Sequence, residues 1–154
     1  MPHKRGRLTG LLVLCAVVMA GCGSGGSSST LSRSQLISQA DVICKRVNEK
    51  LADVNSKLTS QQAFASIAPE LAAFERQELS KLEALKPPAS MSSDWRQILA
   101  STRTLTDTTA QLGVAAKKND LKSAQQLANQ NKKAQESLVS ITTRDGFKEC
   151  SKEA

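Results

Sequence analysis

The chain has 154 residues, with 21 Lys and Arg against 14 Asp and Glu, so its formal net charge at pH 7 is +7. It contains no Tyr and one His, His3, which lies in a segment that we expect to be removed. Without it the chain cannot build a Ser-His-Asp triad, a His-ligated metal centre or a histidine pH switch, which argues against most enzymes.

The first 21 residues show the three parts of an export signal. Lys4, Arg5 and Arg7 precede an almost entirely apolar run at residues 8–19, and small residues follow it. As a helix this run is about 18 Å long, which is short for a bilayer core of about 30 Å. We therefore expect residues 1–21 to be a signal peptide that is removed, and not a spanning anchor.

Cys22 follows Met19, Ala20 and Gly21. This arrangement resembles the lipid attachment site of bacterial lipoproteins, with Met19 where Leu, Val or Ile is more usual. The resemblance implies acylation of Cys22, by chains such as palmitate, and anchoring to the extracytoplasmic face of the cell membrane. Several chains bind stably where one is marginal. The alternative is an ordinary secretory signal that ends near a cysteine.

Residues 22–31 continue as a Gly/Ser-rich tether with a root-mean-square reach of about 15 to 20 Å. Without the signal, the chain has 18 basic and 14 acidic residues, a net charge of +4. Two basic clusters remain, formed by Lys117, Lys118 and Lys122 and by Lys132 and Lys133. We interpret them as solvated helix faces, with binding of anionic lipid or wall polymers as the alternative. Nucleic acid is not an expected partner outside the cytoplasm.

The cysteines predict one disulfide. Cys15 lies in the signal and Cys22 takes the lipid, which leaves Cys44 and Cys150. In an oxidising compartment two such thiols are expected to pair. Closing a loop of this length stabilises by up to about 4.7 kcal/mol in the chain-entropy model. Free or metal-binding thiols are the alternative, although two thiolates alone make a poor zinc site.

Apolar residues spaced by three and four predict four amphipathic helices. The first covers residues 34–58, with Ser32 or Ser34 as its N-cap. The second carries apolar residues from 64 to 85 and ends before Pro87. Pro69 lies within it, so either the main helix starts near Ala68 or a short preceding turn kinks there.

The third and fourth helices follow after short turns. The third begins at Ser93 and Asp94 and has a heptad pattern. Its apolar stripe is Met91, Trp95, Ile98, Thr102, Leu105, Thr109, Leu112 and Ala116. The fourth runs from a cap at Asp120 to residue 143 and stops at Gly146, after which Phe147 can pack back. Its stripe is Leu121, Ala124, Leu127, Asn131, Ala134, Leu138 and Ile141.

Four such helices joined by short turns predict an all-α fold, an antiparallel up-down four-helix bundle tied by the disulfide. A single domain at residues 32–154 is large enough to bury one core. The segments at residues 40–48, 85–88 and 145–150 resemble those of small actinobacterial envelope lipoproteins. The resemblance covers essentially the whole mature chain and supports the helical domain and the disulfide. The family has no established activity to carry over.

Polar residues interrupt the apolar stripes. Thr102, Thr109 and Asn131 occupy seam positions, where we expect them to bond backbone carbonyls or to specify register; lining a ligand cavity is the alternative. Glu78 falls on the stripe of the second helix, and we expect it at the rim. We interpret Trp95 as a core anchor near the bundle end.

The acidic residues predict no catalytic site. Glu75, Glu78 and Glu83 on the second helix, or Glu49 and Asp53 on the first, have ordinary spacings. Without histidine they cannot complete the di-metal motif of helical bundles. We therefore predict no catalytic residue, no metal site and no cofactor.

These observations favour a non-enzymatic, membrane-anchored envelope lipoprotein that binds a protein or a cell-wall component near the membrane. The alternative is a small-ligand-binding helical module, in which the polar seam of the third and fourth helices opens a cavity. A third hypothesis is an enzyme that uses carboxylates alone, with Glu78 as its candidate residue.

Overall fold

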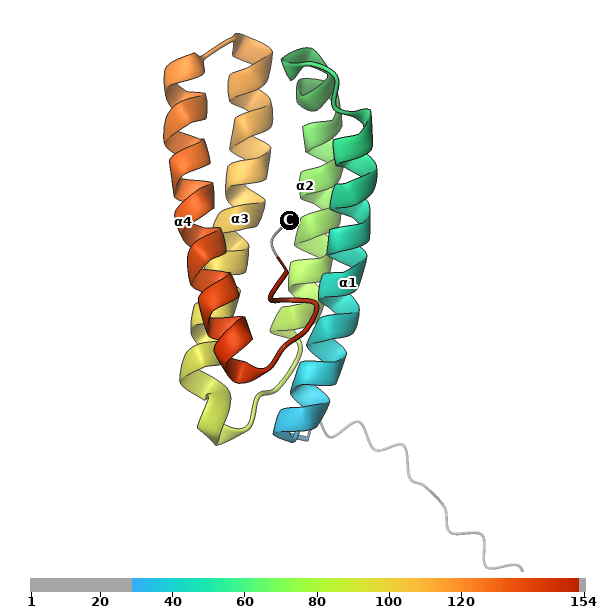
Figure 1. Ribbon diagram of the computed structural model, residues 1–154, viewed down its shortest axis with the longest axis vertical. Coiled ribbons are helices and arrows are strands. Elements are labelled where there is room, and N and C mark those ends of the chain that lie inside the picture. Colours follow the sequence, from blue (N-terminus) through green and yellow to red (C-terminus); the bar gives the residue numbers. More distant parts are fainter. Residues whose placement is uncertain (1–28, 153–154) are drawn as a thin grey trace, which may run out of the picture.

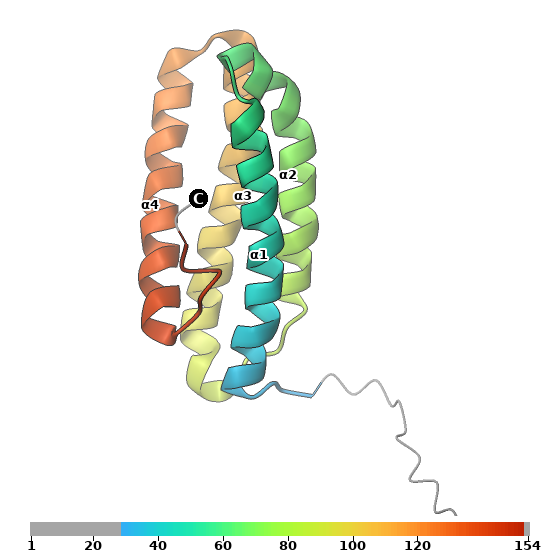
Figure 2. The same cartoon turned by 45° about the vertical axis from the view of Figure 1, so that its right-hand side comes forward.

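The computed structural model describes residues 29–152 (Figure 1). They form four α-helices, α1 (Arg33–Lys57), α2 (Gln61–Glu83), α3 (Ser92–Lys118) and α4 (Leu121–Asp145), and one 3-10 turn, η1 (Ala89–Met91). The helices run alternately up and down, as both views show (Figures 1 and 2), and the described part of the chain has no strand. The predicted all-α antiparallel bundle is confirmed. Cys22 and the signal lie outside the described residues.

Capping residues fix the start of α1 and both ends of α4. The Ser32 hydroxyl accepts a hydrogen bond from the Gln35 N–H, while the Gln35 side chain accepts one from the Ser32 N–H, which is a capping box. Asp120 accepts from the N–H of Ser123 at the start of α4. Gly146 ends α4 with φ of 84°, a left-handed conformation that glycine adopts without strain. Each of these caps was predicted from the local sequence.

At the second helix one of the two predicted alternatives is wrong, and at the third helix the predicted cap is wrong. The second helix begins at Gln61 and not near Ala68; Ser60 caps it by accepting from Ala63 N–H. Pro69 lies inside α2, on the exposed side, where water can bond the carbonyl that proline leaves without a donor. Ser93 does not cap α3, because the helix continues directly from η1 with no side-chain hydrogen bond at its start.

Each helix packs against the next along the chain, α1 on α2, α2 on α3 and α3 on α4. Since α3 has neighbours on two sides, it buries Ser101, Thr108 and Ala115 in addition to part of the predicted stripe. Three stripe residues, Thr102, Leu105 and Leu112, are only half-buried. Gly113 brings α3 very close to α2: a Cβ at this position would lie 2.5 Å from the Cβ of Ala68. The fourth stripe was wrong at its first position, because Leu121 is 72% exposed at the turn.

The densest core lies at the end of the bundle where α1 begins and α4 ends. Its buried members are Leu36, Ala40, Ile43, Leu82, Met91, Trp95, Ile98, Ile141, Phe147 and Cys150. The ring of Phe147 packs back onto Trp95, with 6.3 Å between the ring centroids and 15° between the planes. Trp95 is therefore a core anchor near the bundle end, as predicted.

The C-terminal segment, residues 146–152, leaves α4 and turns into the space between α4 and α1 (Figures 1 and 2). A disulfide joins Cys150 of this segment to Cys44 in the middle of α1, 106 residues apart in sequence. The predicted pairing is confirmed. The segment thus takes the place that direct packing of α1 on α4 has in a closed four-helix bundle.

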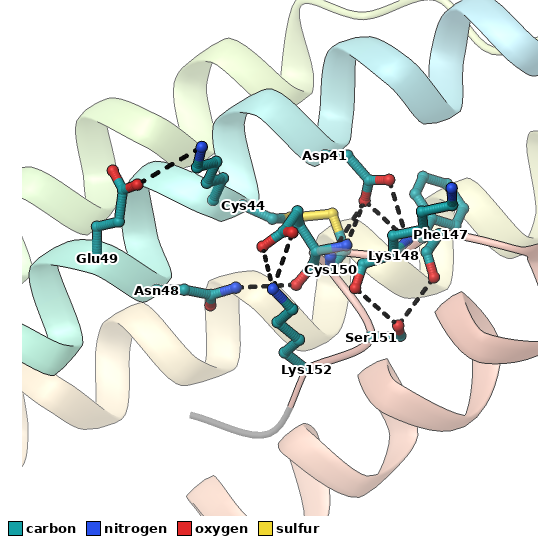
Figure 3. A network of polar contacts seen from close by, with 11 residues as sticks. Asp41, Cys44, Asn48, Glu49, Phe147, Lys148, Cys150, Ser151 and Lys152 are labelled. Carbon is teal, nitrogen blue, oxygen red and sulfur yellow. Dashed lines mark hydrogen bonds and ion pairs between the residues drawn. A yellow bond between two sulfur atoms is a disulfide. The ribbon is translucent and has the colours of Figure 1, made fainter.

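Hydrogen bonds from α1 also hold the C-terminal segment (Figure 3). The Asp41 carboxylate accepts from three consecutive backbone N–H groups, those of Lys148, Glu149 and Cys150, at 2.9, 2.9 and 3.2 Å. Two turns further along α1, the Asn48 amide donates to the Glu149 carbonyl at 2.9 Å. The carboxylate thus satisfies three backbone donors at once and holds the segment against α1.

Candidate ligand-binding cavity

A cavity of about 250 Å³ lies between the helices, beside the dense core, and is partly open to solvent, since the exposed Asn55 and Lys152 belong to its lining. All four helices and the C-terminal segment contribute to its wall. The lining residues are Cys44, Val47, Asn48, Leu51, Asn55, Glu75, Glu78, Leu79, Leu82, Thr102, Leu105, Thr106, Thr109, Asn131, Gln135, Leu138, Val139, Glu149, Cys150 and Lys152. An apolar cavity of about 150 Å³ is enough to hold benzene, so this one can accept a molecule larger than a single ring.

The cavity follows from two features of the sequence. Where the dense core has Trp95 and Ile98, the next turns of α3 place Thr102, Thr106 and Thr109 inward. Side chains of this size fill less space than leucine or phenylalanine, and close-packed interiors contain few voids larger than a water molecule. The C-terminal segment also lies between α1 and α4 (Figure 2) and contributes Glu149, Cys150 and Lys152 to one part of the wall.

The three polar seam residues all lie in the cavity wall. Thr102 donates to the Ile98 carbonyl at 2.9 Å, and Thr109 donates to the Leu105 carbonyl at 3.1 Å, the expected bonds one turn back. The Asn131 amide of α4 donates to the Thr108 hydroxyl of α3 at 2.8 Å. The two interpretations of the seam are thus compatible, because these residues bond the helices and line a cavity together.

Glu75 is the most unusual group in the wall. Only 9% of the residue is exposed, and one carboxyl oxygen, Oε1, lies 3.3 Å from the Thr109 hydroxyl, whose single proton it shares with the Leu105 carbonyl. The other, Oε2, is buried and has no hydrogen-bond partner. Burial raises the pKa of Glu75 from its ordinary value of 4.5 to about 7, against the opposing effects of the Thr109 hydrogen bond and the Arg76 charge.

Glu78 is buried like Glu75, but it has charged partners, and its position differs from our prediction. It is not at the rim: only 2% of the residue is exposed. Arg46 of α1 contacts one carboxylate oxygen at 2.8 Å, and Lys81, one turn on, contacts the other at 2.6 Å. Because a buried carboxylate is tolerated when it is paired, these two cations explain how Glu78 can face the interior at a position of the apolar stripe.

The C-terminal segment closes one side of the cavity. Cys44, Cys150, Glu149 and Lys152 all belong to the lining. Lys152 contacts both carboxylate oxygens of Glu149 at 2.8 Å, so the charges of this pair are balanced (Figure 3). The disulfide therefore has a place in the wall as well as a structural role, and its loss would open the cavity on this side.

In the sequence, Glu75 stood out only as one of the three acidic residues named on the second helix, with ordinary spacing. The signal that could have found it is the face of α2 that packs on α3. On that face Leu71, Glu75, Leu79 and Leu82 follow one another at spacings of four, four and three, and all four are buried. The predicted stripe shared Leu71 and Leu82 with this face. It also included Phe64, Ile67 and Phe74, which are only half-buried, and passed over Glu75.

The two basic clusters of the sequence lie away from the cavity. The basic cluster of Lys117, Lys118 and Lys122 lies exposed at the turn between α3 and α4, at the end of the bundle opposite the start of α1 (Figure 1). Within residues 29–152, no group of three or more His, Cys, Asp or Glu is arranged to hold a metal ion. Over the same residues, no helix has the length and apolar character needed to cross a bilayer.

Comparisons of this chain with protein-family models, curated proteins and solved structures found no match. What the cavity can bind therefore follows from the groups in its wall. The cavity offers leucine and valine walls, a few hydroxyl and amide groups, and one carboxyl group without a charged partner. Apolar walls with a small number of placed polar groups are typical of small-molecule binding sites.

Proposed function

We propose that this protein is a non-enzymatic binding module of the cell envelope, held at the membrane by lipid on Cys22, and that its ligand is a small molecule bound in the cavity between the four helices. The cavity is the observation that carries this proposal, since a bundle with no ligand to bind has no need to leave about 250 Å³ open at its centre. The size is somewhat below the usual range of drug-sized sites, about 300 to 1,000 Å³, which favours a ligand of one ring with a short chain.

Binding of a protein or wall component was the first hypothesis from the sequence, and the cavity now favours the alternative. The exposed large apolar residues, Val42, Val114 and Leu121, are divided between α1 and the region of the α3–α4 turn. Single exposed apolar residues are normal on a soluble surface and do not define an interface. The interior offers a more specific arrangement of groups than these positions do.

The lipid anchor is tested by phase partitioning. The full chain expressed with its own signal should enter the detergent phase, and Cys22→Ser should remain in the aqueous phase. A Cys22→Ser chain that is still membrane-bound, or a wild-type chain in the aqueous phase, would count against the anchor. Ligand binding is unaffected by this outcome, because the cavity lies within residues 44–152.

The cavity is tested by calorimetry on the secreted Cys22→Ser chain, which avoids detergent that could occupy it. Phenylpropanol, a neutral probe with one ring and a short chain, should bind to this protein. Leu105→Trp should abolish binding by filling the cavity, whereas Leu112→Trp, one heptad further along α3 and outside the lining, should retain it. Far-ultraviolet circular dichroism checks that both variants are helical. Equal binding by all three proteins would place the probe elsewhere and reject the proposal.

A further inference from the structure

The acidic groups in the cavity wall differ in how their charge is balanced. Glu78 is paired with Arg46 and Lys81, and Glu149 is paired with Lys152. Glu75 has no ion pair within 4.0 Å among the described residues, and its one hydrogen bond comes from a neutral hydroxyl. It is therefore the position in the wall where a positive charge is missing.

The surroundings of Glu75 make an uncompensated carboxylate unfavourable. An ionised group buried without a partner loses its hydration, whereas a charge-assisted hydrogen bond to an ammonium group restores much of that stabilisation. The α3 side chain in contact with Glu75 is Thr109, which is not ionisable, and Arg76 acts on it only from the next position in α2. Rotation about the last side-chain bond of Glu75 exchanges its two oxygens, so either can face a ligand in the cavity.

We propose that the ligand is a small amphiphilic amine, whose ammonium group pairs with Glu75 while its apolar part contacts the leucine walls. This inference rests on the proposed function. The walls that would hold the apolar part are Leu79 and Leu82 of α2, Leu105 of α3 and Leu138 of α4. Thr102 and Asn131 lie in the same wall and offer oxygen acceptors for further ammonium hydrogens.

Charge complementarity separates this ligand class from others of the same size. A carboxylate or phosphate would meet Glu75 without a neighbouring cation free to bind it, since Lys152 is held by Glu149 and Arg46 by Glu78. A purely apolar molecule would bury the carboxyl group without giving it a partner. An amine supplies both the charge and the hydrogen-bond donors that are missing.

The experiment compares three probes with one skeleton: phenylpropylamine, phenylpropanol and phenylpropanoate. Each is titrated by calorimetry into the Cys22→Ser chain at pH 8, where an alkylamine is protonated and Glu75 is mostly ionised. The amine should bind at least about tenfold more tightly than the alcohol, the range expected when a charged hydrogen bond is added. Phenylpropanoate should bind most weakly.

Glu75→Gln keeps the shape of the side chain and removes its charge. It should remove about tenfold or more of the affinity for phenylpropylamine and leave that for phenylpropanol within about twofold. Glu136→Gln on the exposed side of α4 is the matched control and should change neither affinity. With Glu75 left unchanged, carbon-13 NMR can follow the titration of its carboxyl group. Saturating amine should lower the pH midpoint of this titration by about one pH unit or more.

The outcomes separate this inference from the proposed function. The amine proposal would be rejected if amine and alcohol bound equally, if phenylpropanoate bound more tightly, or if Glu75→Gln left the amine affinity unchanged. In each of these cases the cavity would still be a binding site for a small molecule. Absence of binding by all three probes would overturn the amine and the cavity site together.

Discussion

Replacing Glu75 with Gln should change how the stability of the protein depends on pH. The folded chain holds the Glu75 proton up to about pH 7, whereas the unfolded chain releases it near the ordinary pKa of 4.5. Between these values the folded state binds more protons, so the free energy of unfolding falls as the pH rises. The contribution of protonated Glu75 is fully present below pH 4.5 and is lost as the pH rises through about 7.

The structure sets the size of this effect. A pKa raised from 4.5 to about 7 corresponds to about 3 kcal/mol, at about 1.4 kcal/mol per pH unit. Gln does not titrate. Between pH 4 and pH 8, the free energy of unfolding of Glu75→Gln should therefore rise by about 3 kcal/mol relative to that of the wild type. Because other carboxyl groups titrate in both proteins, it is this difference that isolates Glu75.

Urea denaturation of the two proteins, followed by far-ultraviolet circular dichroism at several pH values, measures the difference directly. Glu136→Gln serves as the control, since the Glu136 side chain is 64% exposed and its difference from wild type should stay nearly constant with pH. A Glu75→Gln difference that is flat with pH, or that moves in favour of wild type as the pH rises, would refute the reasoning.

Three further variants test the packing that surrounds the cavity. Gly113→Ala should destabilise the protein by about 1 to 3 kcal/mol in urea denaturation, because the new Cβ would overlap that of Ala68 and force α2 and α3 apart. Cys44→Ser with Cys150→Ser should reduce stability by up to about 4.7 kcal/mol, the chain-entropy value for a loop of about 100 residues, and should weaken binding of a cavity probe. Asp41→Ala should destabilise by about 1.5 to 3 kcal/mol and increase amide hydrogen exchange at residues 148–150, since three backbone donors lose their acceptor.

Gly113→Ala and Asp41→Ala each have a matched control in the chain. Val114→Ala, next to Gly113 but exposed, should change stability by less than about 0.5 kcal/mol. Asp53→Ala removes an exposed ion pair with Lys57 and should change stability by at most about 1 kcal/mol. If Gly113→Ala were as mild as Val114→Ala, or if exchange at residues 148–150 were unchanged in Asp41→Ala, the corresponding contacts would be less important than the geometry indicates.

The parts of the fold that were predictable are those with local chemical causes. Ser32, Asp120 and Gly146 act within one turn of their own positions, so the sequence alone locates the helix ends that they fix. The pairing of Cys44 with Cys150 followed from counting cysteines once the signal and the lipid site were set aside. Pro69 shows the limit of such rules, because its effect on α2 depends on whether the lost hydrogen bond faces solvent or core.

The sequence indicated a cavity at the polar seam only as an alternative, because its existence depends on how distant segments meet. A seam position tells only that a side chain points inward, and Thr109 there is equally consistent with a filled core. What leaves space is the combination of small side chains on α3 with a C-terminal segment between α1 and α4 (Figure 2). Glu75 and Glu78 make the same point: both lie inward on α2, and only the fold shows that Arg46 reaches one of them and not the other.

The most direct test of the account is NMR titration of the nitrogen-15-labelled Cys22→Ser chain with phenylpropylamine. The account predicts chemical-shift changes concentrated at residues of the cavity wall, with Glu75, Thr102, Thr109 and Asn131 among the most affected, and their loss in Leu105→Trp. Changes confined to the surface, or the same changes in Leu105→Trp, would contradict the claim that this bundle binds a ligand between its helices.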